Sequence, residues 1–461
     1  MDPQQSNRAA YTVNRGLFDA FTAPSDNPAV QPPRNLRNTI LSLCLPGWAA
    51  RPQDFTDAWS PDHRAGGTAT ARRIASVFGD VPKADTAYTS TGHRLEEVYG
   101  FVVDAELQVG EADHDQEARY ERAYRALHRA EEVADPASAD CRTHTVPTDA
   151  YRAYLRHAVD HDNARAAHNH ARQHGELAEE EFDLVRRVFL QMERDGGREI
   201  RQELATLATT TRNVVARAFA DARERFASAE LDLDGVPTRL SELIPADWAV
   251  GGGVWGSARY GAEAVGRVGQ AEADAWAWHT GIADGIWSRG AERVHSDTPI
   301  EGMELTFEFT SVAVYRPWLQ FLLLGMPGWE VPGMGPGELS QGLRGDNSRS
   351  WWPLLTTAFL AVRDLRIRAD WGPADRDLIA SAREGAALGW GPFQVAGEYA
   401  HQPQGVHDRV PSELLGDELV VPGAQVVGVL GQVVPFSPPG LTEVLIPRQE
   451  SLLAGNAYLI S

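Results

Sequence analysis

The chain has almost no lysine and little cysteine. Lys83 is the only lysine among 461 residues, and only two cysteines are present. A Walker A phosphate loop, the lysine of a protein kinase and the Schiff base of a pyridoxal phosphate enzyme all need lysine. The segment DVPKAD at residues 80–85 fits none of these patterns, which argues against the three classes. Cys44 and Cys141 form neither a C-x-x-C pair nor a dense disulfide framework, so we expect two reduced thiols in a cytosolic protein.

Positive charge and long apolar runs are also scarce. The chain carries 43 basic and 64 acidic residues, a net charge of −21, and no basic block, so we expect no nucleic-acid partner. The first thirty residues lack the apolar core of a signal peptide, which predicts a cytoplasmic protein or one exported without such a peptide. Residues 419–441 carry no charge, but several prolines and glycines interrupt them, which favours buried β-strands over a membrane span.

Changes in composition along the chain predict an α+β protein with five regions. Residues 1–37 are polar and proline-rich, which is typical of an extended polar arm. A mixed, mainly helical region follows at 38–110, and then a long helical bundle or coiled-coil-like segment at 111–235. A connector rich in glycine and tryptophan at 236–302 leads to an antiparallel, β-sandwich-like domain at 303–461.

The helical bundle gives the clearest pattern. Asp113 starts a plausible capping box, Pro147 precedes a second helix, and Gly196 ends a third. Apolar residues between 200 and 218 then alternate at spacings of four and three, which is typical of a coiled-coil seam. Four helices with short connections predict an up-down bundle or long helical hairpins.

The connector and the C-terminal region show shorter patterns. Residues 270–278 alternate large and small side chains, which favours a strand and leaves an alanine-rich helix open. Alternation at 305–309, and an apolar then amphipathic stretch at 359–368, indicate strands, whereas 375–384 looks helical. Short valine runs between Pro and Gly continue beyond these and favour a sandwich or barrel.

Tryptophans beside Gly or Pro, at the predicted ends of strands, are the first candidates for contact with a ligand or partner. Exposed, such rings would bind a sugar, another protein or a membrane interface. Buried, they would fill the core and corners of the sandwich. The candidates are Trp318, Trp329, Trp351, Trp352 and Trp390.

Histidines are the second candidates. His157 and His161 stand four apart on a predicted helix, a spacing that lets two imidazoles reach one metal ion. The sequence shows no third or fourth ligand, so a solvated polar face is the alternative. The string GGGVWG at 251–256 matches G-x-G-x-x-G without the buried strand that a dinucleotide site needs. We therefore predict no cofactor.

Three functions remain. The first is a non-enzymatic interaction or self-assembly protein, which uses the helical bundle and the Trp-rich β domain to bind another protein or a second copy. The second is a membrane-active protein, similar to a pore-forming toxin, with residues 248–290 as the insertion segment. The third is a carbohydrate-active enzyme or binding protein with a dispersed site. Because no catalytic motif is complete, the sequence favours the first and leans against an enzyme, while contact with membranes or carbohydrate stays open.

Overall fold

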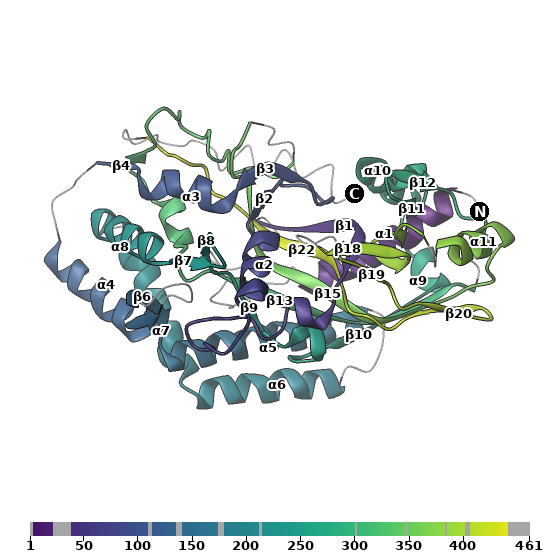
Figure 1. Ribbon diagram of the computed structural model, residues 1–461, viewed down its shortest axis with the longest axis horizontal. Coiled ribbons are helices and arrows are strands. Elements are labelled where there is room, and N and C mark those ends of the chain that lie inside the picture. The colour runs from purple at the N-terminus through teal and green to yellow at the C-terminus, as the bar shows by residue number, and fades with distance from the viewer. Residues whose placement is uncertain are drawn as a thin grey trace.

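The fold is built around one large antiparallel sheet with helices around it (Figure 1). The prediction of an α+β protein with antiparallel sheets is therefore confirmed. The computed structural model describes residues 3–21, 38–108, 113–134, 141–173, 179–211, 214–299, 302–345, 349–382, 385–401 and 406–440.

The central sheet has the strand order β1-β22-β15-β13-β10, with β9 on the outer side of β13, and β21 and then β20 beside the end of β15. Its strands come from three of the predicted regions, so it is not a separate C-terminal sandwich, and the predicted sandwich is not confirmed. Their bounds are β1 (Thr39–Ala49), β9 (Glu242–Ile244), β10 (Gly256–Gly261), β13 (Glu304–Tyr315), β15 (Leu354–Arg368), β20 (Glu413–Leu415), β21 (Glu418–Val421) and β22 (Gln425–Val433).

Both faces of the middle of the sheet are covered, which explains why its strands are apolar on both sides. Every residue of β15 from Leu354 to Val362 is buried. On one face Leu360 belongs to the same apolar cluster as the N-terminal helix. On the other, Phe359 stacks on Phe78 at the end of α2 (Thr68–Phe78), with ring centroids 4.8 Å apart. Alternation begins beyond Asp364, which has a φ of 52°, so the prediction for 359–368 is confirmed.

Helix α1 (Pro3–Phe21) corrects the prediction of an extended polar arm. Ala9, Val13 and Leu17 recur at a spacing of four and are buried against the core, and the helix contacts α5 and α10. The polar side chains Ser6, Asn7, Thr12 and Asn14 are buried as well, so the polar average of this segment does not report its burial. The proline-rich stretch that suggested an extended chain begins at Pro24, and residues 22–37 lie outside the described part of the chain.

The predicted bundle forms helices, but a β-hairpin interrupts it. Asp113 caps the first helix as predicted, since its carboxylate accepts the N–H groups of Asp115 and Gln116 at 3.1 Å. The predicted fourth helix divides into α7 and α8, and Ile200, Leu207 and Ala218 of its seam are buried inside the molecule, so a coiled coil is not confirmed. The bounds are α4 (His114–Leu127), β5 (His128–Ala134), β6 (Cys141–Pro147), α5 (Asp149–Gln173), α6 (Glu179–Arg194), α7 (Gly197–Thr210), α8 (Val215–Ser228), β7 (Glu230–Leu233) and β8 (Val236–Arg239).

The predicted connector contributes helices and edge strands. Residues 270–278 lie in helix α10, so the strand that their alternation favoured is wrong there. The helix predicted at 375–384 is confirmed up to Ala382 as α11, and residues 383–384 lie outside the described part of the chain. A small sheet has the order β12-β11-β16-β17. The remaining bounds are β2 (Asp80–Pro82), β3 (Ser90–Arg94), α3 (Leu95–Val103), β4 (Glu106–Leu107), α9 (Ala262–Gly266), α10 (Gln270–Thr280), β11 (Trp287–Arg289), β12 (Glu292–Val294), η5 (Phe321–Gly325), β14 (Trp329–Glu330), α11 (Pro373–Ala382), β16 (Leu388–Trp390), β17 (Phe393–Ala396), β18 (Glu398–His401) and β19 (Val406–Arg409).

A side chain replaces a missing strand at the edge of β13. Strand β10 pairs with β13 as far as Phe309, and β9 takes over at Ala313. Between them, Asn163 of the buried face of α5 donates from Nδ2 to the carbonyl of Ser311 at 2.9 Å and accepts the Ser311 N–H on Oδ1 at 2.9 Å. The amide thus satisfies the backbone groups that the gap leaves open, and it holds α5 against the sheet.

Candidate functional site

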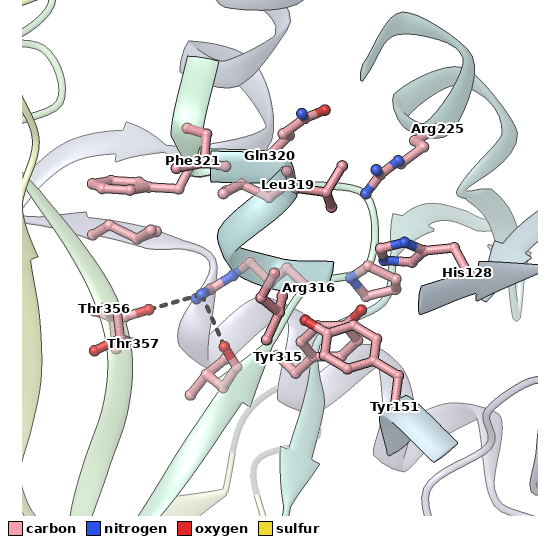
Figure 2. A pocket seen from close by; sticks show the side chains of 16 residues that line it. His128, Tyr151, Arg225, Tyr315, Arg316, Leu319, Gln320, Phe321, Thr356 and Thr357 are labelled. Atoms are coloured by element: carbon pink, nitrogen blue, oxygen red, sulfur yellow. Dashed lines mark hydrogen bonds between the residues drawn. The ribbon is translucent and has the colours of Figure 1, made fainter. Parts of the chain in front are cut away.

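A cavity of about 90 Å³ lies where the end of the sheet meets the helical region (Figure 2). Its walls come from the start of β5, from α5, α7 and α8, from the end of β13 with the segment that follows it, and from β15. This volume holds several water molecules or one small ligand, because a single water needs roughly 10–15 Å³ on this measure. The polar side chains in its wall are His128, Tyr151, Arg225, Tyr315, Arg316, Gln320, Thr356 and Thr357.

Aromatic rings of α4 pack behind His128, the first residue of β5, whose ring lines the cavity. Tyr120, Tyr124 and His128 stand four residues apart, and their rings follow one another with centroids 6.0 and 4.8 Å apart. Tyr151 of α5 meets the His128 ring edge-on at 5.5 Å. The Arg225 guanidinium from α8 lies 4.5 Å from the centre of the Tyr124 ring, within the range of a cation–π contact. These contacts fix His128 and Arg225 beside one another.

Arg225 is a buried cation without a counter-ion among the described residues. Only 7% of the residue is exposed, and its Nε has no hydrogen-bond partner. Asp221, one turn earlier on α8, makes its ion pair with Arg217 at 3.2 Å and acts on Arg225 only from beyond ion-pair distance. Burial of an unpaired charge is strongly unfavourable, so a guanidinium in this position favours the entry of an anion into the cavity.

Arg316 shows how the same fold satisfies a second buried arginine. Its guanidinium donates to the carbonyl oxygens of Thr356 at 2.7 Å and Phe78 at 2.6 Å. Figure 2 shows this side chain turned toward Thr356, away from Arg225 and His128. Burial lowers the pKa of Arg316 to about 9. Arg316 therefore ties α2 to the sheet, and Arg225 is left as the cation that faces the cavity.

Several neutral groups complete the wall. Burial, with the charge of Arg225 beside it, holds the pKa of His128 well below its usual value, so the ring is neutral at pH 7. Its Nδ1 and the Oε1 atom of Gln320 have no hydrogen-bond partner. Burial raises the pKa of Tyr151 and of Tyr315, so both hydroxyls keep their protons. Apart from Arg316, which donates to backbone carbonyls, the wall offers the Arg225 cation, several donors and an acceptor, a set that suits a carboxylate or a phosphate.

The predicted contact tryptophans lie mostly in the core, which corrects their assignment to a surface. Trp318, Trp329, Trp352 and Trp390 are at most 2% exposed. The indole N–H of Trp318 donates to Leu240 O at 2.8 Å, and that of Trp329 to Met326 O at 2.9 Å. These rings fill the space between sheet and helices, as the alternative interpretation expected. Trp351 alone of the five is on the surface, where it is 38% exposed and stacks on His93.

The predicted metal pair is not completed within the described residues. His157 hydrogen-bonds through Nε2 to Asp195 Oδ2 at 2.8 Å, and the His161 ring lies against Phe189. In the described ranges no three His, Cys, Asp or Glu side chains come together in a way that could hold a metal ion. His157 thus contacts the residue that follows α6, and His161 contacts the face of α6. The two rings are held by different partners and not by one shared site.

None of the cavity residues was singled out from the sequence as a site. Two signals were present: the spacing of Tyr120, Tyr124 and His128 along one helix, and an arginine in the core-facing register of Ala218 and Ala222 on α8. Each has an ordinary structural explanation alone, and only the contact of Arg225 with the Tyr124 ring joins them. Comparisons of the chain with models of protein families, with curated proteins and with solved structures find no match.

Proposed function

We propose that the protein binds a small organic anion, a carboxylate or a phosphate ester, in the cavity between the start of β5, α5, α8 and the end of β13. The buried Arg225 guanidinium carries this proposal, because it lines the cavity and has no described carboxylate at ion-pair distance. An anion that pairs with it would supply the missing charge and gain charge-assisted hydrogen bonds.

Each neighbouring group has a role in this proposal. Arg225 binds the anionic oxygens, and the hydroxyls of Tyr151 and Tyr315 donate to the same group or to one beside it. Gln320 Oε1 accepts a hydrogen bond from a hydroxyl or an amine on the ligand. The preferred ligand is thus a small acid that carries a donor near its charged group. This proposal shares with the first hypothesis only that it is non-enzymatic, because that hypothesis expected another protein or a second copy as the partner.

The test of the proposal is binding to purified protein. Acetate, a 2-hydroxy carboxylate, inorganic phosphate and glycerol phosphate serve as probes, with neutral acetamide as the blank, and thermal unfolding and calorimetry report binding. A ligand at 100 times its Kd should raise the free energy of unfolding by about 2.7 kcal/mol.

Substitution of Arg225 separates specific binding from general salt effects. Arg225→Met should lower the affinity about 100-fold or more, because it removes the charge-assisted bonds. It should leave the ligand-free protein as stable or more stable, because it removes a buried unpaired charge. Arg198→Met is the control, since that side chain is 81% exposed on α7. Equal ligand stabilisation of wild type and Arg225→Met would refute the proposal.

The other two hypotheses stay predictions. Within the described residues no helix has the length and apolarity needed to cross a membrane, and residues 270–280 of the suggested insertion segment form helix α10. A carbohydrate site would have to use Trp351 or other surface groups, because the remaining candidate tryptophans are buried. Neither hypothesis has a described feature that favours it as strongly as Arg225 favours an anion.

A further inference from the structure

Helix α6 exposes large apolar side chains along one face. Phe182 is 56% exposed, Phe189 41% and Leu190 50%. Residues seven apart on a helix lie close to one line, so the two phenylalanines share a stripe and Leu190 borders it. The inner side of α6 packs on α5, and in Figure 1 α6 forms the lower edge of the molecule with α5 between it and the sheet. The two phenylalanine rings border this contact, with centroids 5.8 Å (Phe182) and 5.9 Å (Phe189) from those of His168 and His161 on α5, and the rest of each ring is exposed. This stripe is the place where large exposed apolar side chains are densest among the described residues.

The charges on α6 are divided between its two halves. The first five residues, EEEFD, contain Glu179, Glu180, Glu181 and Asp183. The second half carries Arg186, Arg187 and Arg194, and its one acid, Glu193, is paired with Arg201. Asp183, Arg186 and Arg187 are exposed and make no ion pair with another described residue. Acids in the first turn also suit the helix dipole, but the dipole does not account for the exposed phenylalanines.

We infer that α6 is a self-association surface, on which a second copy of this chain lays its own α6 antiparallel across a twofold axis. An antiparallel arrangement sets the acidic half of each helix against the basic half of the other, whereas a parallel one would oppose like charges. Asp183 of one copy then faces Arg187 of the other, and the phenylalanine stripes meet between them. The pairing is isologous, so it closes as a dimer and does not extend into a fibre. This surface is separate from the anion cavity and from the buried seam of α7 and α8.

The first test measures mass against concentration by light scattering after size exclusion. We expect a concentration-dependent rise from the chain mass of 50.4 kDa toward twice that value. Phe182→Gln with Leu190→Gln should abolish the rise, and both side chains are exposed, so the fold should tolerate the change. Trp278→Gln on α10 is the matched control, because Trp278 is an 80% exposed aromatic residue on another helix, and it should dimerise as the wild type does.

A charge-exchange pair tests the antiparallel geometry. Asp183→Arg and Arg187→Asp should each weaken the homodimer at least tenfold, because each opposes like charges across the twofold axis. A mixture of the two variants should form a heterodimer in which both contacts are complementary again, detected by native mass spectrometry. The thermal unfolding midpoint of each variant, unchanged from wild type, shows that the fold is intact.

Four results would overturn the inference. These are a monomer at every concentration, a dimer that the α6 substitutions leave unchanged, and a mixture of charge variants that forms no heterodimer. The fourth is a monomer that binds anionic liposomes and loses that binding with Phe182→Gln and Leu190→Gln, which would assign the stripe to a membrane surface instead.

Discussion

At the scale of single residues, His128 and Arg225 determine each other's chemistry. The guanidinium and the surrounding rings keep the imidazole neutral, because burial disfavours its charged form and the neighbouring cation repels a second positive charge. An anion bound to Arg225 would relieve that repulsion. We therefore expect ligand binding and protonation of His128 to favour one another, and the affinity for an anion to rise as the pH falls.

The same residue makes a prediction about stability. In the unfolded chain the His128 ring takes up a proton near pH 6.5, its ordinary pKa. In the folded chain burial and Arg225 lower that pKa, so below pH 6.5 the unfolded state binds more protons than the folded state. The contribution of His128 is thus fully present above about pH 6.5 and is lost as the pH falls, at up to about 1.4 kcal/mol per pH unit. Urea unfolding at pH 7.5, 6.5 and 5.5 should show a smaller loss for His128→Gln than for wild type.

The control for this measurement is His114→Gln, since the His114 ring is 90% exposed at the start of α4. Its pH dependence should follow that of the wild type. The prediction is wrong if His128→Gln and the wild type lose stability in parallel between pH 7.5 and 5.5.

At the scale of secondary-structure elements, the contact between α5 and β13 depends on one amide. Asn163 satisfies both backbone groups of Ser311, and its Oδ1 also accepts the Ser311 hydroxyl at 2.6 Å. Asn163 and Ser311 are both buried. Since α5 also carries Tyr151 into the cavity wall, this contact positions one side of the candidate site.

Loss of the Asn163 side-chain amide should lower the stability of the fold. Asn163→Leu leaves the N–H and C=O of Ser311 buried and unsatisfied, and we expect it to lower the free energy of unfolding by about 2–4 kcal/mol. The Ser311 amide should also exchange its hydrogen faster, because its acceptor is gone. Arg156→Ala, at an exposed position on the same helix, should change the stability by less than about 0.5 kcal/mol. A loss below 1 kcal/mol for Asn163→Leu would contradict this account.

Elements also differ in how well the sequence predicts them. The start of α4 at Asp113 and the alternation in β13 follow from local spacing, and both were predicted correctly. In α10 the large and small residues alternate because every second position is alanine, and alanine suits a helix equally well, so local spacing could not decide. The cavity forms only when residues between 128 and 357 in the sequence come together in the fold. Local sequence patterns do not show which helix packs on which, so the cavity could not be predicted from them.

At the scale of the whole molecule, the strand order places late residues in the middle of the sheet. Strand β22 lies between β1, near the start of the chain, and β15. It pairs with β1 from Thr39 to Ala49 and with β15 from Leu354 to Val362, and all nine of its residues are buried. Without β22, both neighbouring strands become open edges.

A chain that ends at residue 424 should therefore not reach the native fold. We expect it to lack near-ultraviolet circular dichroism and to aggregate, because two apolar edges lie unpaired. A chain that ends at residue 440 keeps every described strand and should fold, which makes it the control. A soluble, cooperatively unfolding product from the shorter chain would show that β22 is dispensable to the sheet.

The pairing of β1 with β22 also sets a waiting time during synthesis. At roughly 5–20 residues per second, about 20–75 s pass between completion of β1 and the appearance of its partner. For that interval the segment TILSLCLPGWA stays unpaired on the ribosome, with no charged side chain to keep other chains away. The yield of folded protein should then depend on how long the nascent chain is kept apart from its neighbours, and slower synthesis should lower that yield rather than raise it.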